Sequence, residues 1–65
     1  MLINLNGQTE VVPDHHTLRD LIEQRKPRPP FAVEVNKRLV RRQEYDKTPL
    51  RERDEVEIVT LVGGG

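Results

Sequence analysis

The chain has 65 residues, enough for one domain, and a domain of this size buries only roughly 60% of the surface that its unfolded chain exposes. It contains no cysteine, which excludes disulfides and thiolate metal sites as sources of stability. Eleven basic residues balance eleven acidic ones, so no overall electric field would draw the domain to nucleic acid or to an anionic membrane.

Apolar residues are nevertheless frequent enough for a folded core. Leu, Val, Ile and Phe make up 19 of the 65 residues, well above the roughly 20% below which chains tend to stay disordered. The apolar runs are too short to span a bilayer, and the start lacks the charged and then apolar pattern of a secretory signal. We therefore expect a compact cytoplasmic protein with no membrane or nucleic-acid partner.

The first twelve residues predict a β-hairpin. Ile3 and Leu5 fall on one face of an alternating strand. The following pair, Asn6-Gly7, tolerates the positive φ angles of a two-residue hairpin turn. The segment 8–12 then returns as the second strand, and Pro13 ends it because proline has no N–H for a ladder.

A short helix follows this hairpin. Thr17 predicts its N-cap, with Asp20 three residues later completing a capping box. The apolar residues repeat at the spacing of one buried helical stripe: Leu18, Leu21 and Ile22. The helix must end by Lys26, because the residue before a proline avoids the helical region. The proline-rich segment 27–30 is then a stiff, extended connector.

The second half of the chain predicts strands. Residues 31–35 alternate in polarity, 36–37 are suited to a turn, and 39–40 form a short returning strand. Residues 41–49 have no regular pattern, so we expect an irregular segment. The strongest strand pattern in the chain is at 56–60.

This order of elements (hairpin, helix, strand, short strand, long strand) predicts an α+β domain with the helix on one face of the sheet. The last strand fits best in the centre, parallel to the first. The fold expected is a ubiquitin-like β-grasp with a mixed sheet of four to five strands. We expect residues 1–62 to form this domain and 63–65 to form a flexible glycine tail, with no internal repeat.

The composition argues against an enzyme. The chain has no serine and no cysteine, which removes the commonest catalytic nucleophiles. Its two histidines, His15 and His16, are adjacent in a loop, whereas a metal-binding pair favours an i, i+4 helical spacing or alternation along a strand. We expect them in a solvated loop, and we predict no catalytic residue and no metal site.

Two charged segments are candidate binding sites. The basic one contains Lys37, Arg38, Arg41 and Arg42. Nucleic-acid sites usually add stacking aromatics, and the chain offers only Phe31, which we assign to the core, and Tyr45. A solvated face is therefore expected, with an acidic protein partner as the alternative. The acidic segment, 52–57, has the alternation of a half-buried strand and needs no functional role.

The glycines Gly63, Gly64 and Gly65 end the chain directly after its best strand. They could be a frayed end. Alternatively, a terminus without side chains could thread a narrow channel of another enzyme, because glycine permits close backbone approach and unusual φ angles. The position of these glycines, just behind the last strand of a β-grasp pattern, favours the second interpretation.

These features resemble the small ubiquitin-like sulfur carrier proteins of bacterial thiamin (thiazole) biosynthesis, the ThiS family. The resemblance runs nearly end to end and is carried by six segments: Asn6-Gly7, Thr17–Ile22, Ala32–Asn36, Arg41–Tyr45, Asp54–Val59 and Val62–Gly65. The chain departs from the family pattern at Arg53, where glycine is usual, at Tyr45, where tryptophan is commoner, and in its proline-rich connector. A non-glycine residue at a positive φ costs of order 1 kcal/mol, so this turn could differ in type.

The resemblance implies that the protein is a substrate in a cycle run by partner enzymes. A ubiquitin-activating-like adenylyltransferase would use ATP and Mg²⁺ to convert the carboxylate of Gly65 to an acyl adenylate, while Gly63 and Gly64 thread its channel. Sulfur from cysteine, delivered by a desulfurase relay, would give a thiocarboxylate that thiazole synthase consumes. The chain itself would bind no cofactor.

The last strand also predicts a docking surface. Val56 and Ile58 share one face, so if these face the helix, Val59 and Leu61 are exposed next to the tail. We expect Val59, Leu61 and Val62 to contact the partner enzymes. Two alternatives remain open: a sulfur carrier for molybdopterin synthesis, and a regulatory ligand-binding β-grasp domain of the kind appended to synthetases and GTPases.

Overall fold

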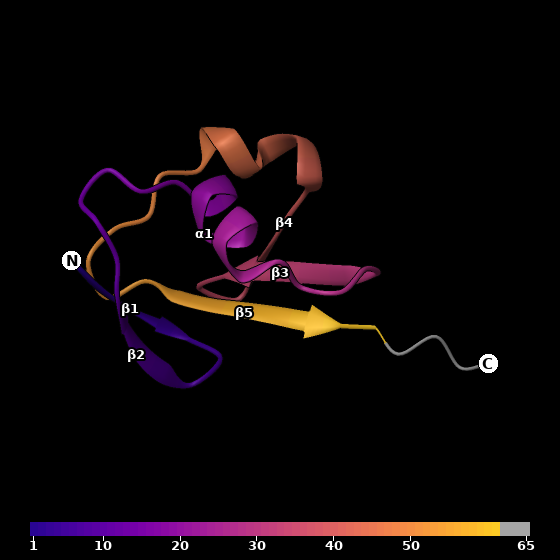
Figure 1. The fold of residues 1–65 in the computed structure, drawn as a ribbon, viewed down its shortest axis with the longest axis horizontal. Coiled ribbons are helices and arrows are strands. Elements are labelled where there is room, and N and C mark those ends of the chain that lie inside the picture. Colours follow the sequence, from indigo (N-terminus) through magenta and orange to yellow (C-terminus); the bar gives the residue numbers. More distant parts are fainter. Residues whose placement is uncertain (62–65) are drawn as a thin grey trace.

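The protein, seen in a computed structural model that describes residues 1–61, has a five-stranded mixed sheet with one α-helix on one face (Figure 1). This confirms the predicted β-grasp. The elements in chain order are β1 (Leu2–Leu5), β2 (Gln8–Val11), α1 (Leu18–Arg25), β3 (Phe31–Val35), β4 (Arg38–Val40), the 3₁₀ helix η1 (Arg42–Lys47) and β5 (Glu55–Thr60). Over residues 1–61, no helix has the length and apolar character needed to cross a lipid bilayer.

The strand order in the sheet is β2-β1-β5-β3-β4, with β5 in the centre. It runs parallel to β1, where Asn4 lies opposite Glu55, and antiparallel to β3. Each hairpin turns through two residues of positive φ: 50° and 83° at Asn6 and Gly7, and 51° and 68° at Asn36 and Lys37. The predicted turns and the central, parallel last strand are therefore both confirmed.

The ends of α1 also follow the sequence. The Thr17 hydroxyl accepts the Asp20 amide at 3.2 Å, and the Asp20 carboxylate accepts the Thr17 amide at 3.0 Å. These bonds lower the pKa of Asp20, because the amide of Thr17 and its side chain both favour the carboxylate. The cap is thus fully formed above the ordinary pKa of an aspartate and weakens as the pH falls through the lowered value. Lys26, in the left-handed region, ends the helix.

The core lies between α1 and the sheet and is made of apolar side chains and one tyrosine. No buried polar or charged residue belongs to it within the part of the chain described. Every element except β2 and β4 contributes to it, and so do two loops, through Val12 and Leu50. The nine buried members are Ile3, Leu5, Val12, Leu18, Leu21, Val33, Tyr45, Leu50 and Val56. Ile22, the third member of the predicted helical stripe, is only half-buried at the edge of this core.

The segment expected to be irregular contains a short helix, so that prediction was wrong. Residues 42–47 form η1, which buries Tyr45. Its start is stabilised locally: the Glu44 amide donates to the Arg41 carbonyl at 2.8 Å, and the Arg41 amide donates to the Glu44 carboxylate at 3.3 Å. A 3₁₀ helix of only six residues, with one of them buried, leaves no apolar period to detect. Burial raises the pKa of Tyr45, and the nearby charge of Arg42 opposes this.

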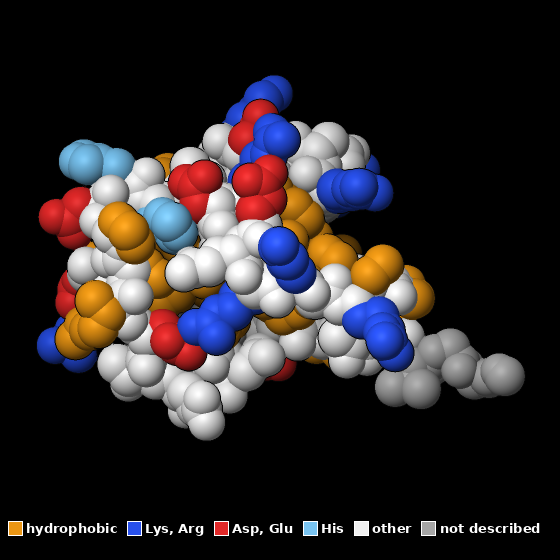
Figure 2. Space-filling model, in the orientation of Figure 1, with side chains coloured by type: hydrophobic (Ala, Val, Ile, Leu, Met, Phe, Trp, Pro, Cys, Tyr) orange, Lys and Arg blue, Asp and Glu red, His pale blue; other side chains and the backbone are white. Residues whose placement is uncertain are grey.

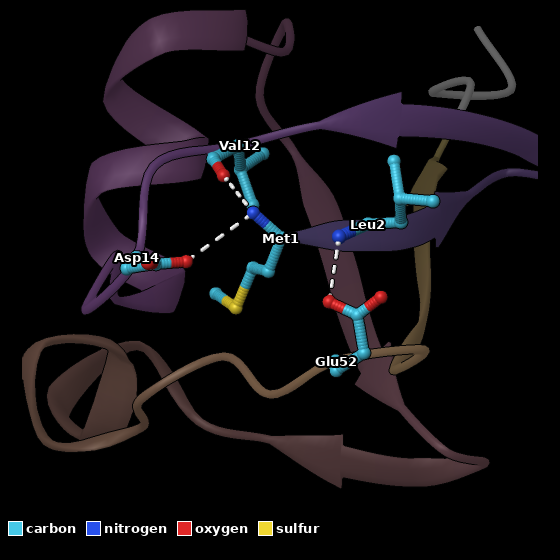
Figure 3. Close-up of polar contacts among 5 residues, drawn as sticks. All are labelled: Met1, Leu2, Val12, Asp14 and Glu52. Carbon is cyan, nitrogen blue, oxygen red and sulfur yellow. Dashed lines mark hydrogen bonds and ion pairs between the residues drawn. The ribbon is translucent and has the colours of Figure 1, made fainter.

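The turn before β5 gives a structural role to two of the four carboxylates of the acidic segment, and Figure 3 shows one of them, Glu52. The Leu2 amide donates to the Glu52 carboxylate at 2.9 Å, and the Leu2 carbonyl accepts the Arg53 amide at 2.7 Å. The Asp54 carboxylate accepts the Arg51 amide at 2.8 Å. Just before β1, the amino group of Met1 donates to the Val12 carbonyl at 2.7 Å. These carboxylates therefore satisfy backbone groups at the start of β1 and β5.

Arg53 adopts a φ of 69° in this turn, which is the strain expected from its departure from the family pattern. We predict that Arg53→Gly raises the free energy of unfolding by about 0.5 to 1 kcal/mol, because relief of the left-handed strain exceeds the added entropy of the unfolded chain. Urea denaturation measures this. The matched Arg51→Gly variant, at a position of ordinary φ, should lower stability; equal effects of the two substitutions would contradict the explanation.

Candidate partner interface

The central strand β5 is held from both sides by the two hairpin asparagines. The Asn6 side-chain oxygen accepts the Ile58 amide at 2.8 Å. The Asn36 side-chain oxygen accepts the Glu55 amide at 3.0 Å. Beyond the strand, the Leu61 amide donates to the Pro30 carbonyl at 2.8 Å. Hydrogen bonds therefore fix the chain up to the last residue that the structure describes.

These roles of Asn6 and Asn36 were missed in the sequence, which identified the two residues only as turn formers. Asn36 also donates its side-chain nitrogen to the Asp54 carboxylate at 3.0 Å. The sequence did carry one indication of these roles, because both turns begin with asparagine. The side-chain amide of asparagine can accept and donate hydrogen bonds, whereas glycine, which is also common in such turns, has no side chain to do so.

The two faces of β5 differ as expected from the sequence. Val56 is 1% exposed and Ile58 is half-buried, both on the side of α1. Val59 and Leu61 are 41% and 52% exposed on the opposite side. Because α1 and η1 both lie on one side of the sheet (Figure 1), no described element covers these two side chains. Their role in docking stays a prediction.

The uncovered side of the sheet, called here the open face, collects more than these two residues. Strand alternation and register place all five exposed large hydrophobic side chains of residues 1–61 on it: Leu2, Val11, Leu39, Val59 and Leu61. For example, Leu2 lies opposite Val11 on neighbouring strands. Apolar side chains gathered on one face indicate an interaction surface more than scattered ones do.

Negative charge lies among these apolar side chains. Glu34 of β3 and Glu57 of β5 are direct cross-strand partners on the open face. Like charges directly opposite each other destabilise a sheet. Neither carboxylate is in an ion pair within residues 1–61. With Glu55, Glu57 and Lys37, Glu34 lines a shallow hollow on this side of the sheet.

The two histidines lie in different surroundings. His15 is exposed, as predicted. The prediction of a solvated side chain was wrong for His16, which is only 17% exposed and has its Nδ1 3.9 Å from the Asp20 carboxylate. Its Nε2 is buried without a hydrogen-bond partner among the described residues. The backbone of His16 is held close to the core because its carbonyl accepts the Leu50 amide at 2.8 Å. No group of three potential metal ligands occurs in residues 1–61.

The basic residues are exposed, as expected, but they do not form one patch. Lys37 lies at the hollow of the open face, beside Glu34 and Glu55. Arg41 and Arg42 line a groove on another part of the surface. The remaining site residues predicted from the sequence, Val62 and Gly63 to Gly65, lie outside the described residues.

Comparison with known proteins covers the whole chain. The model of the ThiS family matches residues 2–65. A crystal structure of the thiamine biosynthesis protein ThiS from Geobacter metallireducens is similar, with a TM-score of 0.85 and 26% identity over 100% of both chains. A solution structure of a thiamine biosynthesis protein from the same organism has a TM-score of 0.77 and 26% identity, covering 100% of this chain and 88% of that one. No curated protein matches the chain. Since the family model covers all but the first residue, the chain belongs to the ThiS family.

Proposed function

We propose that this protein is a sulfur carrier of thiamin biosynthesis and that the carboxylate of Gly65 carries the sulfur. The observation that supports this most is the family match, which extends through the terminal glycines to residue 65. The similar ThiS structure, which aligns over 100% of both chains, supports the thiamin pathway over the two alternatives, a molybdopterin carrier and a regulatory ligand-binding domain.

The chemistry follows from the weak electrophilicity of a carboxylate. An oxygen of the Gly65 carboxylate attacks the α-phosphorus of ATP, pyrophosphate leaves, and an acyl adenylate forms. The terminal sulfur of a persulfide, supplied from cysteine through a desulfurase relay, then displaces AMP and forms an acyl disulfide. A second thiol reduces this disulfide, which leaves the thiocarboxylate on Gly65 and a new disulfide on the donor. A ubiquitin-activating-like adenylyltransferase supplies the site for ATP and Mg²⁺, and thiazole synthase takes the sulfur. This chain supplies the reacting carboxylate and the surfaces that orient it.

The side chains of the described residues have a positioning role in this scheme. The backbone amides of β5 and Leu61 donate hydrogen bonds to Asn6, Asn36 and Pro30, which hold this part of the chain in line. Orientation of a reacting group before the encounter reduces the entropy lost in the reaction. The glycines that follow have no Cβ to obstruct a narrow channel.

Thiocarboxylation is tested by intact mass spectrometry. After incubation with the activating enzyme, ATP and a sulfur source, the mass should rise by the difference between sulfur and oxygen, and fragmentation should place the change on Gly65. A modification at another residue would contradict the proposal. The thiocarboxylated protein is then offered to thiazole synthase. Transfer of its sulfur by this enzyme supports the thiamin carrier over the molybdopterin carrier, whose sulfur goes to a different acceptor.

Docking through Val59 and Leu61, the part of the open face at the end of β5, gives a second prediction. We expect Leu61→Asp to weaken binding to the activating enzyme by more than about tenfold, or 1.4 kcal/mol, because a charge replaces an apolar side chain that is 52% exposed in the unbound protein. Titration calorimetry measures the dissociation constant. Val11→Asp, the same kind of change on the distant edge strand β2, is the control for added charge. An unchanged constant in a folded Leu61 variant would exclude this residue from the interface.

A further inference from the structure

A second candidate surface lies on the helix side of the sheet, next to β4. It is a groove of about 1040 Å³ between α1 and its proline-rich connector on one side and β4 and η1 on the other. Figure 2 shows the molecule hollowed beside η1, where apolar side chains are visible below basic ones. Its apolar lining includes five side chains that are partly exposed or only just buried, Ile22, Pro27, Phe31, Val40 and Tyr45, and the exposed side chain of Leu39 at the sheet edge.

Within residues 1–61, the groove contains a piece of sheet edge that has no backbone hydrogen-bond partner. Strand β4 pairs with β3 only from Val33 to Val35, and the position opposite Phe31 in this register is Arg42, which already belongs to η1. Bonds of the residues flanking β3, Pro30 and Asn36, run to β5. Because antiparallel strands alternate the direction of their backbone groups, the N–H and C=O of Phe31 point away from β5. They face the side from which β4 has departed.

The charge at the rim of this groove is uneven. On the α1 side, Arg19 bonds to the Glu23 carboxylate at 2.9 Å. This bond, and the charge of nearby Asp46 in η1, raise the pKa of Arg19, so the charges there compensate one another. On the η1 side, Arg41 and Arg42 line the groove without an ion pair within residues 1–61.

We propose that this groove binds an extended segment of a partner protein that alternates apolar and acidic residues. The segment adds to the sheet at Phe31, where its backbone bonds the unpaired N–H and C=O. Its apolar side chains pack on Ile22 and Val40, and its carboxylates pair with Arg41 and Arg42. A strand that adds to a sheet edge gains affinity from the main chain and specificity from pockets for alternate side chains. The inference goes beyond sulfur transfer, because the groove is lined mainly by α1, its connector and η1 on the helix side and reaches the open face only at the sheet edge, at Leu39 and Ala32.

The probe is an acetylated and amidated peptide, Val-Asp-Val-Glu-Val-Asp, titrated into the full-length ¹⁵N-labelled protein. Amide shifts should move at Phe31, Val40 and Ile22, and those of Leu2 and Val11 on the open face should stay. Arg41→Glu combined with Arg42→Glu should weaken binding by more than about tenfold. The control is Arg51→Glu, which reverses one arginine charge outside the groove. It should change the dissociation constant by less than about twofold.

Two further peptides test the binding mode. One has lysine in place of every acidic residue, and the other is methylated on alternate backbone nitrogens. Both should bind at least about tenfold more weakly, because the first reverses the charge and the second removes ladder hydrogen bonds. The proposal is overturned if the acidic peptide causes no shift at about 1 mM, if it shifts the open face instead, or if the methylated peptide binds equally well. An unchanged affinity of the folded double variant would also overturn it.

Discussion

Removal of Gly64 and Gly65 is expected to abolish ATP-dependent activation and to change the free energy of unfolding by less than about 0.5 kcal/mol, the usual range for surface changes. Activation is lost because the carboxylate no longer reaches the adenylation site. Stability is kept because the core is complete within residues 3–56, and glycines have no side chain to bury. Pyrophosphate exchange and thermal melts measure the two effects on the same samples.

An added alanine after Gly65 provides the matched variant. It keeps every native residue but places a Cβ at the end that must enter the channel, and it should also abolish exchange. If the shortened or the extended chain is adenylated at the intact rate, the terminus is not the reacting group and the carrier proposal fails. If both melt well below the intact protein, the glycines are part of the fold.

Leu21→Ala is expected to lower the free energy of unfolding by about 2 to 5 kcal/mol, the cost of a lost methyl-rich side chain plus the cavity that it leaves. Leu21 is 0% exposed at the centre of the contact between α1 and the sheet. A domain of this size has a total stability of only roughly 3 to 10 kcal/mol, so the variant should be largely unfolded at moderate urea concentrations. Urea denaturation followed by circular dichroism measures the shift.

Leu39→Ala is the control, since it removes the same atoms from a side chain that is 66% exposed. It should change the free energy of unfolding by less than about 0.5 kcal/mol. Similar losses in the two variants would mean that burial against α1 does not control stability. The activation assay on the folded fraction of either variant should be unaffected, because neither residue belongs to the proposed docking surface around Leu61.

The family and the fold could both be predicted from the sequence because their signals are local. Asn6-Gly7 determines a tight turn, Thr17 and Asp20 determine a helix start, and Pro27 stops the helix whatever surrounds it. The alternation of β5 separates Val56 from Val59 without any knowledge of the neighbouring strands. The glycine terminus and the segments that resemble ThiS proteins are likewise readable along the chain.

Other features were decided only by the tertiary structure. The bond from the Ile58 amide to Asn6 joins residues 52 positions apart, so it exists only once β1 and β5 have paired in one register. Tyr45 is buried because η1 packs near α1, and no apolar pattern marks so short a 3₁₀ helix in the sequence. The unpaired edge at Phe31 depends on where β4 ends beside β3. Local preferences act within a few residues, whereas these contacts depend on the distances that the whole fold imposes between distant segments.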